Sequence, residues 1–226
     1  MEGVVKIKKV LGGIFPTLIF NFRAFGILNA FMMKFPIFIG GGVTVGKISR
    51  DTISFCGTSI KTGMIHIGMG GVSDMPHNHG YIRIDDGAKV TFSGKATIGR
   101  GCDFLIGKRS QVIFGDNFSA GNNFYISSNE GVAFGDNVLL GWNVSIRDSD
   151  GHTIIEDGIE KPNCKKIIVG NHVWIGSDST IFKGVELLDD SVVASHAIVT
   201  KSFYKKNVLI GGFPASIIKE NINWRF

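Results

Sequence analysis

The sequence of 226 residues has little proline and little cysteine. Five prolines without a repeating triplet exclude a collagen-like chain, although glycine is abundant at 31 residues. The three cysteines, Cys56, Cys102 and Cys164, are odd in number and widely spaced, which fits neither a disulfide framework nor a zinc ribbon and favours a reducing cytoplasm. The net charge of +5 suits an anionic small ligand as well as nucleic acid or a membrane surface.

The N-terminus shows no signal-peptide pattern, and its apolar run is too short to span a bilayer because Arg23 and Lys34 interrupt it. We therefore expect a cytoplasmic protein. The segment is nevertheless rich in phenylalanine. We interpret residues 1–60 as a partly helical cap that serves the core. The alternative is a surface for peripheral contact with the inner face of the membrane or with a lipid-linked acceptor.

The C-terminal half repeats every six residues. The first position of each hexad is aliphatic, and the position four residues later is small or β-branched. The first positions are Val169, Ile175, Ile181, Leu187, Val193 and Val199. Two upstream stretches follow the same grid from Phe114 and Phe134, and a weaker one starts at Phe92.

A period of six fits neither a helix nor an alternating hairpin, but it fits short strands separated by tight turns. Gly and Asn after the aliphatic position suit turns that need a positive φ. We predict an all-β fold in which residues 61–210 form a parallel β-helix of three strands per coil. Residues 211–226 would be a C-terminal extension. A segment over residues 147–168 exceeds the repeat by seventeen residues and would protrude as a loop.

Several motifs resemble, in order as well as in wording, the hexapeptide-repeat acyltransferases, in particular the galactoside, maltose and xenobiotic acetyltransferases and the polysaccharide O-acetyltransferases. The motifs are GDNVLLGWNVSI (135–146), SDGHTI (149–154), VGNHVWIG (169–176), VVASHAIVTK (192–201) and GGFPASIIKENINW (211–224). The resemblance extends from about residue 114 to the C-terminus. It implies a left-handed helix, acetyl-CoA as co-substrate, and a homotrimer with active sites between subunits.

The protruding loop contains the residue best suited to catalysis, His152. A sugar hydroxyl needs a general base to become a nucleophile, and the pKa of histidine suits this role. Asp148, Asp150 or a backbone carbonyl would orient the imidazole. The resemblance assigns the same role of general base to His152.

The resemblance also implies roles for residues of the repeat. Asn123 matches an asparagine near the acetyl group, where it would bind the oxyanion, and it suits a structural turn equally well. Trp174 matches an aromatic residue that lines the acceptor cleft, and packing against another subunit is the alternative. Five residues match positions that contact CoA: Ser177, Ser195, Thr200, Lys201 and Lys219.

His77 and His79 are spaced like a metal-binding pair, and γ-class carbonic anhydrases hold zinc on a similar prism. Residues one position apart in an extended chain point to opposite sides, however, and no later histidine completes a ligand set. We therefore expect no metal. Contact of His77 or His79 with the far end of an acceptor is a further interpretation.

Together these features predict an acetyl-CoA-dependent O-acetyltransferase that acts on a sugar or a cell-surface polysaccharide unit. N-acetylation of an amino sugar, free or nucleotide-linked, is the alternative, and an amine would depend less on His152. A non-catalytic β-helix scaffold is the third interpretation, but a scaffold has no use for His152, Asn123 and Trp174 together. No nucleic-acid partner is expected.

Overall fold

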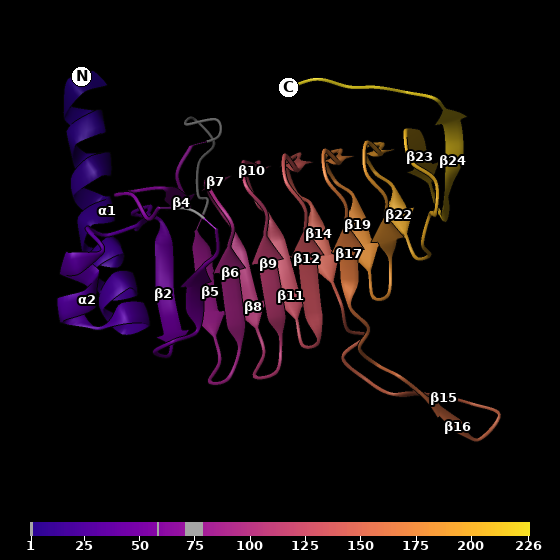
Figure 1. Ribbon diagram of the computed structural model, residues 1–226, viewed down its shortest axis with the longest axis horizontal. Coiled ribbons are helices and arrows are strands. Elements are labelled where there is room, and N and C mark those ends of the chain that lie inside the picture. Colours follow the sequence, from indigo (N-terminus) through magenta and orange to yellow (C-terminus); the bar gives the residue numbers. More distant parts are fainter. Residues whose placement is uncertain (1, 58, 71–78) are drawn as a thin grey trace.

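The computed structural model describes residues 2–57, 59–70 and 79–226, with side chains from residue 12 onward. In this part of the chain, three parallel sheets of nine, seven and six strands form the sides of a triangular prism. Each coil adds one strand to each sheet in turn, so the coils follow one another along the long axis in Figure 1. The architecture is the parallel β-helix that the six-residue period predicts.

We call the three sides sheets A, B and C, in the order in which the chain visits them. Sheet A contains β1 (Ile37–Ile39), β4 (Ile65–Ile67), β7 (Ala96–Ile98), β10 (Phe118–Ala120), β13 (Leu139–Leu140), β18 (Trp174–Ile175), β21 (Val192–Val193), β23 (Val208–Gly212) and the antiparallel β24 (Ala215–Glu220). Sheet B contains β2 (Val43–Ile48), β5 (Gly80–Ile84), β8 (Asp103–Ile106), β11 (Tyr125–Ser128), β14 (Ser145–Arg147), β19 (Thr180–Phe182) and β22 (Ile198–Val199). Sheet C contains β3 (Ile53–Phe55), β6 (Lys89–Phe92), β9 (Gln111–Phe114), β12 (Gly131–Phe134), β17 (Ile167–Val169) and β20 (Glu186–Leu187).

The core of the prism consists of the residues that the hexad pattern selects. All six aliphatic first positions from Val169 to Val199 are at most 2% exposed, which confirms the pattern. In the earlier coils, phenylalanines fill the wider interior. Phe92, Phe114 and Phe134 occupy the same position in successive coils, and their rings stack at 5.1 and 5.5 Å between centroids. Ring stacking therefore runs along the prism axis together with the backbone hydrogen bonds.

Between Phe92 and Val199, all the extra residues lie at one edge of the prism. The steps from sheet C to sheet A and from sheet A to sheet B always take six residues, as from Val169 to Ile175 to Ile181. The step from sheet B to sheet C takes 10, 8, 23 and 6 residues in successive coils, as counted from Phe104 to Phe114, Ile126 to Phe134, Ile146 to Val169 and Ile181 to Leu187. The predicted loop is the 23-residue step at this edge, the B–C corner.

Two helices close the N-terminal end of the prism, α1 (Glu2–Phe25) and α2 (Ile27–Met32). Phe20, Ala24 and Ala30 are buried there. Asn21 fixes α1 to the first coil by donating its side-chain N–H to the carbonyl oxygen of Ile37 at 2.7 Å. In the described part of the chain, no helix combines the length and the apolarity needed to cross a membrane.

The domain boundaries that we expected from the sequence need correction. The β-helix begins at Ile37 and not at residue 61, because β1 pairs with β4 and β2 with β5. The first coil was missed because extra residues precede Ile65 and Gly80 and break the six-residue period. At the other end, β23 pairs with β21 to Ile210, and the chain then turns back as β24.

The stacked phenylalanines provide a test of the core. Phe114→Ala removes a ring that is 0% exposed and contacts Phe92 and Phe134, so we expect a loss of about 3–5 kcal/mol in the free energy of unfolding. The measurement is urea unfolding followed by circular dichroism. Tyr204→Ala, at a side chain that is 75% exposed, is the control and should change stability by less than about 0.5 kcal/mol. Equal losses in the two variants would contradict the assigned core.

Candidate active site

The loop that contains His152 is anchored at its start by Asp148. The carboxylate of Asp148 is fully buried and accepts hydrogen bonds from Ser128 Oγ at 2.6 Å and from the backbone N–H groups of residues 129, 130 and 131 at 2.8, 2.9 and 2.6 Å. All four donors belong to the preceding coil. Both carboxylate oxygens thereby accept hydrogen bonds from the preceding coil, so Asp148 anchors the start of the loop.

The two ends of the loop are joined beside Asp148. The backbone carbonyl of Asp148 accepts a hydrogen bond from Lys165 N at 2.9 Å, and Asp150 N donates to the carbonyl of Asn163 at 2.8 Å. The carboxylate of Asp150 forms an ion pair with Lys183, which also donates to the carbonyl of Pro162 at 2.6 Å. Lys183 lies far along the chain and outside any motif, so the sequence alone did not reveal its role.

Beyond this root, the loop becomes a hairpin arm that projects from the prism, as Figure 1 shows. Its strands, β15 (Ile154–Glu156) and β16 (Ile159–Lys161), pair antiparallel, and residues 150–162 are all exposed. His152 lies where the arm leaves the prism. Within the described chain, the imidazole has no hydrogen-bond partner.

Asn123 lies at the opposite edge of sheet B, the A–B corner. Successive coils place His79, Gly101, Asn123, Asn143, Asp178 and His196 in one column there. Asn123 has a φ of 60° and donates its side-chain N–H to Asn143 Oδ1 at 2.8 Å, and Asn143 donates to Asp178 Oδ1 at 2.8 Å. Asn123 therefore makes the contacts of a structural turn, and its amide keeps a second N–H for another acceptor.

The outer face of sheet A has an aromatic cluster near the third edge, the C–A corner. Trp224 from the C-terminal tail stacks on His172 at 4.3 Å between centroids and donates its indole N–H to the carbonyl of His172 at 2.9 Å. Trp174 lies 5.9 Å from Trp224 and remains 39% exposed. The tail thus buries one side of the cluster and leaves part of Trp174 open to a ligand or another subunit.

The residues that match CoA positions lie on several parts of the C-terminal coils. Ser177 and Ser195 belong to the A–B corner, and the hydroxyl of Ser177 accepts a hydrogen bond from Trp142 N at 3.0 Å. Thr200 and Lys201 follow β22 at the B–C corner, and Lys219 lies in β24. All but Ser177 are exposed. Neither Lys201 nor Lys219 takes part in an ion pair of the described chain, and the ammonium of Lys201 lies over the ring of Phe203 at 5.9 Å from its centroid.

Lys205, Lys206 and Cys102 are less suited to bind a ligand or to act as a nucleophile. Lys205 and Lys206 pair with Glu220 at 2.6 Å and Asp189 at 2.7 Å, and the hydrogen bond from Lys206 lowers the pKa of Asp189. Burial raises the pKa of the Cys102 thiol to about 12. Cys102 therefore stays protonated near neutral pH and is unsuited to act as a nucleophile.

A single chain holds His152 and Asn123 at different edges. Asn143, which lies next to Asn123 in the column, precedes the loop anchor Asp148 by five residues across sheet B. At the rise of an extended strand, this separation is about 16 Å. Sheet B is rigid here, since β11 and β14 are each hydrogen-bonded to a strand on both sides. The edges that carry His152 and Asn123 in one prism therefore cannot fold onto each other.

The remaining histidines do not form a metal site in the described chain. His79 is exposed and begins the column of the A–B corner, two coils or about 10 Å from Asn123. His77 lies outside the described residues. His66 stacks on Phe38 at 5.7 Å on sheet A. Among the described residues, no group of three His, Cys, Asp or Glu could hold a metal ion.

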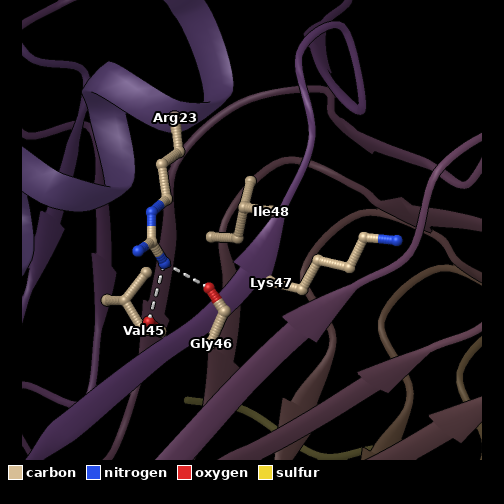
Figure 2. Close-up of a pocket in the computed structure, with 5 residues that line it drawn as sticks. All are labelled: Arg23, Val45, Gly46, Lys47 and Ile48. Carbon is tan, nitrogen blue, oxygen red and sulfur yellow. Dashed lines mark hydrogen bonds between the residues drawn. The ribbon is translucent and has the colours of Figure 1, made fainter.

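A hollow of about 500 Å³ lies at the far end of the prism, between α1 and β2. Figure 2 shows Arg23 reaching across it to donate to the carbonyl oxygens of Val45 and Gly46, at 3.0 and 2.5 Å. Lys47, which also lines it, pairs with Asp86 at 2.7 Å. Both cations are engaged within the chain, and Arg23 joins α1 to β2 of the first coil. The hollow lies apart from His152 and Asn123.

Comparison with known proteins places this architecture in a defined class. The fold is the left-handed parallel β-helix, as in the solved structure of the polySia-specific acetyltransferase NeuO, which superposes with a TM-score of 0.52 at 24% identity over 82% of this chain and 79% of that one. A polysialic acid O-acetyltransferase from Neisseria meningitidis is 40% identical over 80 residues, 34% of this chain and 37% of that protein. No family model matches the chain.

A longer match is to a protein without an assigned activity. An uncharacterized 24.8 kDa protein in the cps region of Klebsiella pneumoniae is 31% identical over 157 residues, 69% of this chain and 70% of that protein. The chain spans only about a quarter of the length of the galactoside and chloramphenicol acetyltransferases that it also matches. The named sequence relatives of the chain, and the solved structures that share its fold, are hexapeptide-repeat acetyltransferases.

The anchoring role of Asp148 can be tested by replacing its carboxylate with an amide. Asp148→Asn keeps the shape but exchanges an acceptor oxygen for an NH₂ group, so at least one buried donor loses its partner. We expect a loss of about 2–4 kcal/mol in the free energy of unfolding, measured with urea. Asp157→Asn, at the exposed tip of the arm, is the matched control and should leave the midpoint unchanged. If both variants unfold at the wild-type midpoint, Asp148 is not the anchor.

Proposed function

We propose that this protein is an acetyl-CoA-dependent O-acetyltransferase that acetylates a hydroxyl of a sugar or of a cell-surface polysaccharide unit. The observation that supports this most directly is the placement of His152. The histidine is exposed at the base of an arm whose root is fixed by Asp148 and by the Asp150–Lys183 ion pair. A base on a fixed support, open to a ligand, is what hydroxyl activation needs.

In the proposed reaction, neutral His152 accepts the proton of the sugar hydroxyl while its oxygen attacks the thioester carbonyl of acetyl-CoA. The oxyanion of the tetrahedral intermediate would accept the free amide N–H of Asn123. Collapse breaks the carbon–sulfur bond, and the CoA sulfur takes the proton from His152. The products are the acetyl ester and free CoA, and the imidazole is neutral again.

We assign Asp148 and Asp150 to positioning and not to proton transfer. Their carboxylates are committed to the loop root, so a backbone carbonyl or a group of a second subunit would orient His152. Trp174 offers its exposed indole to the apolar face of a sugar. His79, two coils away on the edge of Asn123, would contact a more distant part of the acceptor.

Assembly of three copies would complete the site. His152 and Asn123 belong to different edges of one prism, so the arm of one copy would meet the A–B edge of the next. CoA would lie between prisms along Ser177 and Ser195, with Thr200 beside it and Lys201 and Lys219 on its phosphates. The arm also exposes three isoleucines, Ile154, Ile155 and Ile159, at 56, 65 and 63%. Exposed apolar side chains on a protruding hairpin favour burial against a neighbouring subunit.

The proposed base is tested by His152→Ala. Release of free CoA from acetyl-CoA would be measured over a panel of neutral and amino sugars, oligosaccharides and polysaccharides. We expect at least a hundredfold lower turnover with hydroxyl acceptors, and unchanged acetyl-CoA affinity by calorimetry. His66→Gln, on sheet A of an early coil, is the control and should retain activity. Turnover with amino sugars alone, little affected in the variant, would instead indicate N-acetylation, and no CoA binding would leave a scaffold.

The proposed trimer is tested by substitutions of the exposed isoleucines on the arm. In the antiparallel pairing, Ile154 and Ile159 lie on one face of the hairpin and Ile155 on the other. If the shared face packs on a neighbour, Ile154→Ser/Ile159→Ser should shift the sedimenting species from trimer toward monomer at micromolar concentration, with unchanged secondary structure. Ile155→Ser is the matched control. A wild-type protein that sediments as a monomer would refute the proposed assembly.

A further inference from the structure

The N-terminal end of the prism has an apolar surface that the core does not use. Four side chains of α2 are largely exposed: Ile27 at 64%, Leu28 at 72%, Phe31 at 59% and Met32 at 64%. Ile14 and Phe15 of α1 are also exposed, at 48 and 71%. The short helix is held from behind by buried Ala30 and by contacts of the Phe31 ring with Phe22 and Phe35. Its apolar side chains therefore face outward on a fixed support.

The N-terminal segment that forms this surface is rich in positive charge. The first 50 residues contain seven Lys and Arg against one Glu, a net charge of +6, whereas the remaining 176 residues have 17 against 18, a net charge of −1. The whole positive balance of the chain therefore lies in its first 50 residues. Lys34 follows α2, and Arg50 lies against Gly26 between the two helices. Both are exposed, and neither joins an ion pair among the described residues.

The α1 helix is oriented so that its axis could lie along a flat surface. Figure 1 shows α1 lying across the end of the prism, with its axis crosswise to the direction in which the coils stack. If this end faced a flat surface, α1 would run parallel to that surface. An exposed apolar face, flanking cations and a helix axis in the plane are the properties of segments that bind at the headgroup region of a bilayer.

We propose that the N-terminal end, α1 and α2 with Lys34 and Arg50, docks on an anionic membrane surface. Leu28 and Met32, one helical turn apart, would enter the acyl boundary, and the cations would lie at the lipid phosphates. The proposed trimer strengthens the case without being required, because three parallel prisms would present three such ends on the same side. The active-site edges would then stand upright above the bilayer, within reach of a membrane-attached acceptor. This last step rests on the proposed function.

The test is flotation of the full-length protein with vesicles. We expect co-flotation with phosphatidylglycerol–phosphatidylcholine vesicles, at least tenfold weaker binding to pure phosphatidylcholine, and release by 0.5 M salt, at which the Debye length falls to about 4 Å. Leu28→Gln/Met32→Gln keeps the net charge and removes the apolar side chains, so its partitioning should fall at least tenfold. Tyr204→Gln/Phe226→Gln is the matched control, with side chains 75 and 65% exposed on other parts of the chain, and should float like the wild type.

Three results would overturn the proposal: wild-type protein that stays in the soluble fraction, a Leu28/Met32 variant that floats like the wild type, or equal losses in both double variants. Sedimentation in the absence of lipid tests the competing occupant, a second copy of the chain. If the wild type forms a larger species that the Leu28/Met32 variant loses, the surface is a contact between copies. His152→Ala should float normally, and the Leu28/Met32 variant should acetylate a soluble acceptor normally, so membrane docking and catalysis can fail independently.

Discussion

The in-register stacking of coils is the constraint on which the structure depends. Every strand inside a sheet of the prism is hydrogen-bonded to the coil before and the coil after it, so each inward position must repeat at the same height on the same side. Buried aliphatic and phenylalanine side chains satisfy this requirement along the whole axis. A residue added within a strand would reverse the direction of every side chain after it. Insertions are therefore tolerated only in turns.

The turns differ in how many inserted residues they tolerate. At the A–B and C–A corners, columns of Asn, Asp and His at positive φ are linked by side-chain hydrogen bonds, as between Asn123 and Asn143 and between Asn117 and Asn137. An extra residue there would break the column. From Phe104 to Val169 the B–C corner has no column of residues at positive φ, and its length varies from coil to coil. Side-chain hydrogen bonds there join Ser110, Ser128 and Asp148 at the ends of the strands. The arm with His152 leaves the prism at the edge where an insertion disturbs least.

The sequence predicted those features that local pattern determines. The inward residues from Phe92 to Val199, the position of the arm and the cap at the N-terminus follow from periodicity and composition. The role of Asp148 could not be predicted in this way, because its four donors come from a coil 17–20 residues earlier and only the fold brings them to its carboxylate. Its closeness to His152 in the sequence suggested a catalytic partner. The contact of Trp224 with His172 could not be predicted from the sequence for the same reason, since 52 residues separate the two.

Rigidity also limits where chemistry can occur. A prism with all three sides hydrogen-bonded and a packed interior is too stiff to close around a substrate, and the hollow beside Arg23 lies at the end of the prism away from His152. In the proposed mechanism each edge offers one part of a site: the imidazole of His152 at the B–C corner, amide and hydroxyl groups at the A–B corner, and indole on sheet A near the C–A corner. Such parts can act on one ligand only if a second prism supplies the missing edge. A fold that is too stiff to move its own residues together can obtain an active site by association, and in the proposed trimer the projecting arm of one copy would make that contact.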